Sequence, residues 1–368
     1  GTEQVVALTA DQLKALSSSQ VVALSSAQAA VLTSGQVSGL SPTQVAALET
    51  ADMAALSTSA LKAMSAAQVK ALTTDQLVAL TTDQAAGLGK DFVAALTSAQ
   101  LTAMEDDDVG KLSTSAVQAL SNAALAGLTT AQVEGLGTAQ VAALTDVQIK
   151  QLSSANIQAL TSDQAKVLKQ AQLGALTSAQ VAAMDTVDLA QLNSAQIGAL
   201  SALGLAGLST TQIANLGTNQ VAALTADQLK VLSTNQVVAL STVQAAALTS
   251  AQVAGLSPTQ ITAMQTEDVA ALTNSALNAL NAAQVKALTT AQVVGLTTLQ
   301  VAALTTAQIA ALKTANIKVI ETADIAALTT EQIASLTTAQ AASLTTAQIR
   351  SLSNEQVAQL TTAQFAAL

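Results

Sequence analysis

Large apolar residues return at two fixed positions in every eight residues of this sequence. When the chain is divided into octads from Gly1, position eight is Leu in 41 octads, and position five is a larger apolar residue in 41. The 368 residues contain 46 such octads without an insertion or deletion, and their consensus is T-T-A-Q-V-A-A-L. A fixed period of this kind is typical of a repeat architecture. Positions five and eight are therefore predicted to form the core.

The polar positions predict where each helix begins. Position one is Ser or Thr in 33 octads, and position four is Gln in 33. Ser or Thr followed three residues later by Gln is a capping box, in which each side chain binds the other residue's backbone N–H. Both prolines, Pro42 and Pro258, occupy position two, the first helical residue of this register, where proline is well tolerated. The pattern predicts one short helix, of about six residues, in each octad.

Charged residues follow the same period. Acids collect at position three and lysines at position six, as in the pairs Asp11/Lys14, Asp163/Lys166 and Asp227/Lys230. Residues three apart lie on the same face of a helix. These two positions are therefore predicted to face solvent, whereas position seven, mostly Ala or Gly, allows neighbouring helices to approach closely.

These signals predict an all-α fold, an α-solenoid (superhelix) of 46 short helices with one capped helix per octapeptide, over residues 1–368 as a single uninterrupted repeat domain. One continuous helix is disfavoured, because eight residues at 100° each shift the apolar columns by about 80° per octad. The alternative is a β-solenoid, but V-A-A-L lacks the period-two alternation of a strand. A six-residue helix is unstable alone, so neighbouring octads must stabilise it, and we expect two or three octads per superhelical turn.

A second level of order appears at position four. Aspartate replaces glutamine at spacings of 56, 80, 80 and 56 residues, in Asp52, Asp108, Asp188, Asp268 and Asp324. The spacings indicate duplicated blocks of seven and ten octads. Because these numbers are neither all multiples of two nor of three, we expect interchangeable surfaces without a specialised groove. Each Asp is expected to replace Gln in the capping box and to need no metal.

The densest charge is the run Glu105, Asp106, Asp107 and Asp108, and two interpretations stay open. These carboxylates offer oxygens to Ca²⁺, but four acids at the start of a helix also stabilise its dipole. The run lacks the spacing of an EF-hand and of Gly-rich calcium repeats. We favour the structural interpretation and predict no metal site.

Two other places depart from the consensus. In Gly89-Lys90-Asp91-Phe92, Phe replaces the position-four Gln and Lys stands where Ser or Thr is usual. This segment is either a binding spot or a local drift or lateral contact, and we favour the second interpretation. Phe365 is at position five of the last octad, where it is either an oversized core residue or an anchor for another subunit.

Composition excludes several classes of function. The chain has no Cys and no His, which removes the usual ligands of zinc, haem, copper and iron–sulfur centres and leaves no nucleophile with an evident base. We therefore predict no enzyme activity, no catalytic or cofactor-binding residue, no cofactor and no small-molecule substrate. The net charge of −10 has the wrong sign for nucleic acid. No run approaches the roughly 18 apolar residues of a membrane-spanning helix, so membrane insertion is not expected.

Two resemblances accompany the repeat. LSPTQVAAL at residues 40–48 resembles the opening helix of the transcription-activator-like effector repeat, but the rest of that repeat, including its base-reading loop, is absent and no function carries over. The uninterrupted LTxxQVxAL pattern, which covers all 46 octads, resembles repeat regions of large secreted or cell-surface proteins of proteobacteria. That resemblance implies an extracellular location.

The terminal octads suggest how the chain functions. GTEQVVAL and TTAQFAAL keep both core positions, although a solenoid normally ends in repeats with a polar outer face. Either the array continues or identical chains stack head to tail, which yields open filaments. We predict a structural protein that forms an extracellular filament with itself as partner. A passive spacer or stalk of a giant secreted adhesin is one alternative. A repeat binding module is another, although no row of aromatic or Arg residues is visible.

Overall fold

One short helix forms in every octad. The computed structural model describes all 368 residues and contains 46 α-helices of four to six residues and no strand. At α6 (Pro42–Ala47) and α33 (Pro258–Ala263), the serine before the proline is the N-cap and accepts the N–H of the position-four Gln. The prediction of an all-α solenoid is confirmed, and the β-solenoid alternative is wrong.

The chain divides into two compact units, Gly1–Gln191 and Leu192–Leu368. The helices of the first unit are α1 (Thr2–Ala7), α2 (Ala10–Lys14), α3 (Ser18–Val22), α4 (Ser26–Ala29), α5 (Ser34–Gly39), α6 (Pro42–Ala47), α7 (Thr50–Ala55), α8 (Thr58–Lys62), α9 (Ala66–Ala71), α10 (Thr74–Val78), α11 (Thr82–Gly87), α12 (Lys90–Ala95), α13 (Ser98–Ala103), α14 (Asp106–Lys111), α15 (Thr114–Ala119), α16 (Asn122–Leu125), α17 (Thr130–Gly135), α18 (Thr138–Ala143), α19 (Asp146–Ile149), α20 (Ser154–Gln158), α21 (Ser162–Lys166), α22 (Gln170–Ala175), α23 (Ser178–Ala183) and α24 (Thr186–Gln191).

The second unit continues the octad register. Its helices are α25 (Ser194–Gly198), α26 (Ala202–Leu205), α27 (Thr210–Ala214), α28 (Thr218–Ala222), α29 (Ala226–Lys230), α30 (Thr234–Val238), α31 (Thr242–Ala246), α32 (Ser250–Gly255), α33 (Pro258–Ala263), α34 (Thr266–Ala271), α35 (Asn274–Asn278), α36 (Ala282–Ala287), α37 (Thr290–Val294), α38 (Thr298–Ala303), α39 (Thr306–Ala311), α40 (Thr314–Val319), α41 (Thr322–Ala327), α42 (Thr330–Ala334), α43 (Thr338–Ala341), α44 (Thr346–Ser351), α45 (Asn354–Ala358) and α46 (Thr362–Ala367). That residues 1–368 form one single domain stays a prediction.

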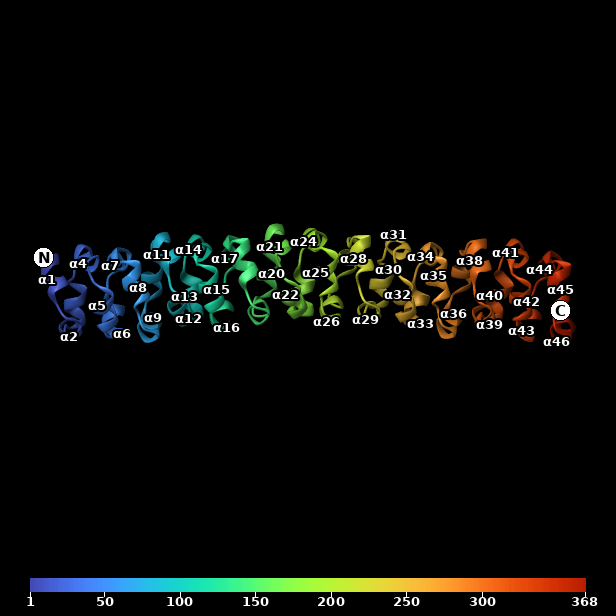
Figure 1. The fold of residues 1–368 in the computed structure, drawn as a ribbon, viewed down its shortest axis with the longest axis horizontal. Coiled ribbons are helices and arrows are strands. Elements are labelled where there is room, and N and C mark those ends of the chain that lie inside the picture. Colours follow the sequence, from blue (N-terminus) through green and yellow to red (C-terminus); the bar gives the residue numbers. More distant parts are fainter. The chain divides into compact units, whose positions relative to one another are not determined.

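Within each unit, a helix packs mainly against the helix three octads away, as α6 does against α9 and α33 against α36. Contacts four octads apart also occur, for example between α8 and α12. In Figure 1 the upper edge of the first unit shows α4, α7, α11, α14, α17, α21 and α24 in succession. A superhelical turn therefore holds more than three and fewer than four octads, and the expectation of two or three was too low. The angle at each corner depends on the extended residues between helices, such as Leu40 and Ser41, whose ψ angles are 144° and 156°.

The predicted columns do form the core. Val45 at position five is fully buried, and Leu48 at position eight is 3% exposed. Small residues at position seven allow close packing against position two of the octad three places earlier. A Cβ added to Gly87 would lie 2.7 Å from Cγ2 of Thr58, which is closer than a side chain tolerates. The core also includes position four, which the capping pattern alone does not require.

Candidate functional site

The position-four glutamine satisfies all its polar groups in two octads at once. In the octad of α17, Oε1 of Gln132 accepts the backbone N–H of Thr129 at 3.0 Å, and the N–H of Gln132 donates to Oγ1 of Thr129 at 3.0 Å. Nε2 of Gln132 donates to the backbone oxygens of Leu101 and Met104, both at 2.8 Å. A primary amide has two N–H groups and one carbonyl, so every hydrogen of this buried amide has an acceptor.

This arrangement recurs along the chain and links each turn to the preceding one. In the second unit, Nε2 of Gln292 donates to the oxygens of Ile261 and Met264 at 2.8 and 2.7 Å. The acceptors lie 31 and 28 residues earlier, at positions five and eight of the octad four places back. We call this repeated set of bonds the glutamine ladder. It is the most regular polar feature of the molecule, and it connects octads that the apolar columns also bring together.

The capping interpretation missed the ladder, although the sequence contains a signal for it. A capping box accepts Glu as readily as Gln, because only a side-chain oxygen is needed. Position four nevertheless contains 33 Gln and no Glu. A column that excludes Glu indicates that the side chain must also donate a hydrogen bond, and the burial of Gln132 to 0% exposure agrees with that requirement.

Asparagine at position four keeps part of the ladder. Nδ2 of Asn156 donates to the oxygen of Leu128 at 3.0 Å, and Nδ2 of Asn316 donates to the oxygen of Leu288 at 3.1 Å. Both acceptors are the position-eight carbonyl, 28 residues earlier. The side chain is one methylene shorter than glutamine, which explains why the position-five carbonyl is not reached.

Aspartate at position four does not take the part that we expected. No capping box forms at α7, α14, α34 or α41, where the N-cap residues are Glu49, Glu105, Gln265 and Glu321. The expectation that Asp replaces Gln in the box is therefore wrong for these four helices, whose N-cap residues make no side-chain cap. The five aspartate side chains are nevertheless 1–5% exposed. Buried carboxylate oxygens without a hydrogen-bond partner occur in three of them, namely Asp52, Asp108 and Asp268.

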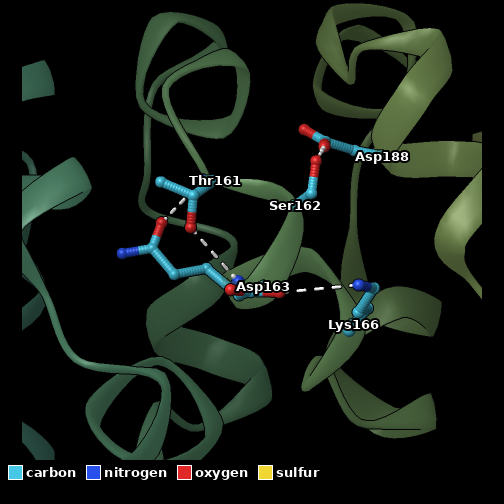
Figure 2. Close-up of polar contacts among 6 residues, drawn as sticks. Thr161, Ser162, Asp163, Lys166 and Asp188 are labelled. Carbon is cyan, nitrogen blue, oxygen red and sulfur yellow. Dashed lines mark hydrogen bonds and ion pairs between the residues drawn. The ribbon is translucent and has the colours of Figure 1, made fainter.

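Burial changes the titration of three of these carboxyl groups. It raises the pKa of Asp108, Asp188 and Asp268 above the ordinary value of 3.8, because removal from water disfavours the charged form. Hydroxyl groups oppose the shift, and for Asp108 the hydroxyl that lowers the pKa is that of Thr82. The Ser162 hydroxyl donates to Oδ1 of Asp188 at 2.6 Å, as Figure 2 shows, and Oγ1 of Thr242 donates to Asp268 at 3.0 Å.

The aspartate helices share one edge within each unit. In Figure 1, α7, α14 and α24 lie on the upper edge of the first unit, and α34 and α41 lie on the upper edge of the second. Spacings of seven and ten octads correspond to about two and three turns when a turn holds between three and four octads. The expectation of interchangeable surfaces is wrong, because it assumed a turn of two or three octads.

The acidic run at residues 105–108 separates into two environments. Glu105, Asp106 and Asp107 line an open hollow of about 400 Å³ at the surface, whereas Asp108 is buried. No group of three or more His, Cys, Asp or Glu side chains is placed to hold a metal ion.

Of the three predicted acid–lysine pairs, only Asp163 and Lys166 form an ion pair, at 3.5 Å (Figure 2).

The two phenylalanines have different surroundings. Phe92 is 1% exposed and therefore belongs to the core, so this ring presents no surface for a ligand or a lateral contact. Its neighbours Lys90 and Asp91 are both exposed, and the half-buried Gly89 makes no side-chain cap. Phe365 is 61% exposed, so it does not fill the core of this chain, and its role as an anchor stays a prediction.

None of the helices has the length and apolar character that crossing a membrane requires.

The fold and the glutamine ladder define an all-α repeat protein whose short capped helices wind into a solenoid. The ALTTAQ repeat matches eleven stretches, at residues 5–42, 45–82, 109–146, 166–202, 181–218, 203–234, 221–258, 261–298, 286–314, 317–354 and 342–368. The chain belongs to the ALTTAQ repeat family.

Other comparisons add little. No curated protein matches the chain. Among solved structures, the leucine-rich repeat-containing protein LegL7 from Legionella pneumophila is similar, with 13% identity and a TM-score of 0.21 over 66% of this chain and 79% of that chain. A similarity at this TM-score carries no argument about fold or function.

Proposed function

We propose that this chain is a structural protein whose copies stack head to tail into an extracellular filament. The observation that carries the proposal is the complementarity between its first and last turns. One offers glutamine amides that lack acceptors, and the other offers backbone carbonyls that lack amide donors.

The donors belong to the first four octads. Gln4, Gln12 and Gln20 are exposed and Gln28 is half-buried, whereas every position-four glutamine from Gln36 onward is buried. In all four octads Oε1 binds the N-cap residue, so each side chain is already held in the ladder conformation. Their Nε2 groups have no protein acceptor in the structure.

The acceptors belong to the last four octads, where no glutamine amide reaches the carbonyls of positions five and eight. Apolar side chains there are also less covered than in the interior. Ile349, Leu352 and Val357 are half-buried, Phe365 is 61% exposed and Leu368 is 40% exposed. Covering this apolar surface would favour association, at roughly 25 cal/mol per Å².

The octad register fixes how the two ends would meet. If a second copy continues the register, its Gln4 faces the carbonyls of Ala341 and Leu344 of the first copy. These residues lie 31 and 28 positions back in the continuous count, the same offsets that the ladder uses inside the chain. Such a contact is heterologous, and a heterologous contact that does not close produces a filament. The same groups would be satisfied by further octads of a longer polypeptide, which is the spacer or stalk alternative.

Analytical ultracentrifugation and negative-stain electron microscopy of residues 1–368 test the proposal. We expect growth into unbranched filaments as concentration rises. Gln12→Glu combined with Gln20→Glu should prevent growth, because the new carboxylates would face carbonyl oxygens while the capping boxes are kept. The matched control is Gln170→Glu, which changes an exposed residue at position two of α22. A monomer that persists at high concentration would contradict the filament and favour the spacer.

The proposed location rests on a separate argument. The LTxxQVxAL pattern resembles repeat regions of large secreted bacterial proteins, which supports an extracellular or cell-surface setting. Immunogold labelling of intact cells of the source organism tests it, and labelling only after permeabilisation would contradict it. The net charge of −10 supports a role without nucleic acid, and we propose no enzymatic activity and no partner other than the chain itself.

A further inference from the structure

Five lysines repeat the spacing of the position-four aspartates. Each aspartate octad has a lysine at position six of the octad five places earlier, so these lysines also recur at 56, 80, 80 and 56 residues. We call them the lysine row: Lys14, Lys70, Lys150, Lys230 and Lys286. Position six is Lys in all five of these octads, but it is basic in only four of the other 41. The row is therefore a specific feature of the sequence and not a property of every octad.

The lysine row presents free charges to solvent. All five side chains are exposed. The one ion pair of the structure joins Asp163 to Lys166, so Asp11 and Asp227 form no ion pair with the row lysines three residues after them. The ammonium groups of the row are therefore available to carboxylates of another molecule.

Exposed acids form a matching row on the aspartate octads. Position one is acidic in four of these octads and in no other octad of the chain, and the fifth has Gln265 at position one and the acid Glu267 at position three. We call these exposed residues the acid row: Glu49, Glu105, Asp185, Glu267 and Glu321. An acid at the start of a helix stabilises the dipole of any octad, so this effect does not explain why the acids accompany the aspartates.

The two rows belong to opposite edges of the first unit. A turn holds more than three and fewer than four octads, so octads five places apart are separated by about one and a half turns. In Figure 1, α2 and α9 of the lysine row lie on the lower edge of the first unit, whereas α7, α14 and α24 of the acid row lie on its upper edge. The lysines of one chain therefore do not meet its own acid row, and only a second molecule can bring the two rows together.

We propose that the lysine row of one chain binds the acid row of a second copy, so that chains associate side by side. The contact joins unlike edges and leaves one edge of each copy free, so further copies can add in the same way. The net charge of −10 disfavours contact between arbitrary surfaces of two copies, whereas the matched rows favour this one. The contact does not depend on head-to-tail stacking, because it uses the edges of the chain and not its terminal octads.

The spacing within the first unit selects the orientation of the two copies. Its three row lysines are separated by 56 and 80 residues, and its three row acids by the same numbers in the same order. Parallel copies offset by five octads therefore align all three pairs, whereas antiparallel copies reverse the order and align two. In the parallel arrangement, Lys70 of the second copy faces the open hollow of about 400 Å³ that Glu105, Asp106 and Asp107 line.

Such a contact depends on several weak pairs that act together. One exposed ion pair contributes little, but pairs held at fixed spacing on two molecules bind simultaneously and strengthen one another. The screening length falls from about 10 Å at 0.1 M salt to about 3 Å at 1 M. The pairing should therefore form at about 0.1 M NaCl, where repulsion between distant charges is already screened, and should be lost at about 1 M.

Negative-stain electron microscopy of residues 1–368 tests the proposal, because it measures the width of a particle separately from its length. The unaltered chain should form side-by-side particles at the lower salt concentration and particles of single width at the higher one. One variant combines Lys14→Glu, Lys70→Glu and Lys150→Glu. It should stay at single width, because both edges of its first unit are then acidic.

A second variant provides the complement. It combines Glu49→Lys, Glu105→Lys and Asp185→Lys, which makes both edges basic, so it should also stay at single width alone. An equimolar mixture of the two variants should restore side-by-side particles, because each edge then meets one of opposite charge. The native chain already accepts both kinds of residue at these positions, with Glu134 at position six of α17 and Lys169 at the N-cap of α22. Circular dichroism should therefore show unchanged helix content in both variants.

The matched control makes the same change in net charge outside the lysine row. It combines Lys62→Glu, Lys313→Glu and Lys318→Glu at exposed residues, and it should still form side-by-side particles. Equal pairing by this control and the lysine-row variant would overturn the proposal, as would a mixture of the two complementary variants that stays at single width. Long filaments of single width at both salt concentrations would overturn it while supporting head-to-tail stacking. Short side-by-side particles would support it while contradicting the filament.

Discussion

The octads of α14 and α17 are neighbours one turn apart in the first unit, and they solve the same packing problem with different polar groups. Val109 and Val133 at position five are both fully buried, and position eight is 3% exposed in one octad and 5% in the other. In α17, Gln132 satisfies every polar group that it buries. In α14, Asp108 is equally buried but both of its oxygens lack a partner. The apolar columns therefore suffice to build the turn, whereas position four decides how consecutive turns are linked.

The largest effect should come from placing a charged residue at position four of the α17 octad, which lacks the acidic N-cap of the α14 octad. Gln132→Glu keeps an oxygen for the capping box but places an unpaired carboxylate against the carbonyls of Leu101 and Met104. We expect a loss of about 3–5 kcal/mol, because an uncompensated buried charge is strongly destabilising. Hydrogen exchange of residues 97–104 and 129–136 should report it locally. The control is Gln20→Glu, at an exposed glutamine, which should change stability by less than about 0.5 kcal/mol.

A smaller effect should follow when the amide is shortened or removed. Gln292→Ala leaves the carbonyls of Ile261 and Met264 without their donor and should cost about 1–3 kcal/mol in urea unfolding. Gln292→Asn should cost less, since Asn156 keeps the position-eight bond in the native chain. If both variants lose the same free energy, the bond to position eight contributes nothing, and the ladder acts through packing alone.

The smallest effect should be a pH dependence carried by the aspartate octads. Burial raises the pKa of Asp108, Asp188 and Asp268, so the folded chain binds protons at a higher pH than the unfolded chain. Their stabilising contribution is fully present below the unfolded value of 3.8 and is lost as pH rises through the raised folded values. The urea midpoint should therefore rise more between about pH 7 and about pH 4 in the native chain than in a variant that combines Asp108→Asn, Asp188→Asn and Asp268→Asn. Parallel pH profiles would contradict this assignment.

The sequence predicts the local structure of this protein better than the way its turns connect. Helix starts follow from Pro42, Pro258 and the Ser/Thr–Gln pairs, because capping depends on residues only three apart. The number of octads per turn depends on the angle at each extended junction, and near-identical repeats give no information on that angle. The ladder acceptors are 28 and 31 residues away, so capping rules do not identify them.

The position-four aspartates are a second case in which the sequence does not reveal what depends on the contact between turns. Their spacing was visible in the sequence, but its meaning depended on the number of octads per turn. Spacings of seven and ten octads bring α7, α14 and α24 to one edge of the first unit only when a turn holds between three and four octads. Their burial was also hidden, because a capping interpretation places position four at the surface. The absence of Glu from position four was the one clue that this side chain is enclosed and must donate.

The ladder also determines how such a chain would respond to being stretched. Each octad is joined to the rest of its unit by its own small set of side-chain bonds, so a pulling force applied at one end loads the outermost octad first. Its release frees eight residues, which can extend by at most about 26–29 Å before the next octad takes the load. Because successive octads are nearly alike, extension should proceed in many similar small steps, and each should reform when the tension falls. The molecule would then absorb mechanical work gradually rather than fail at a single weak point.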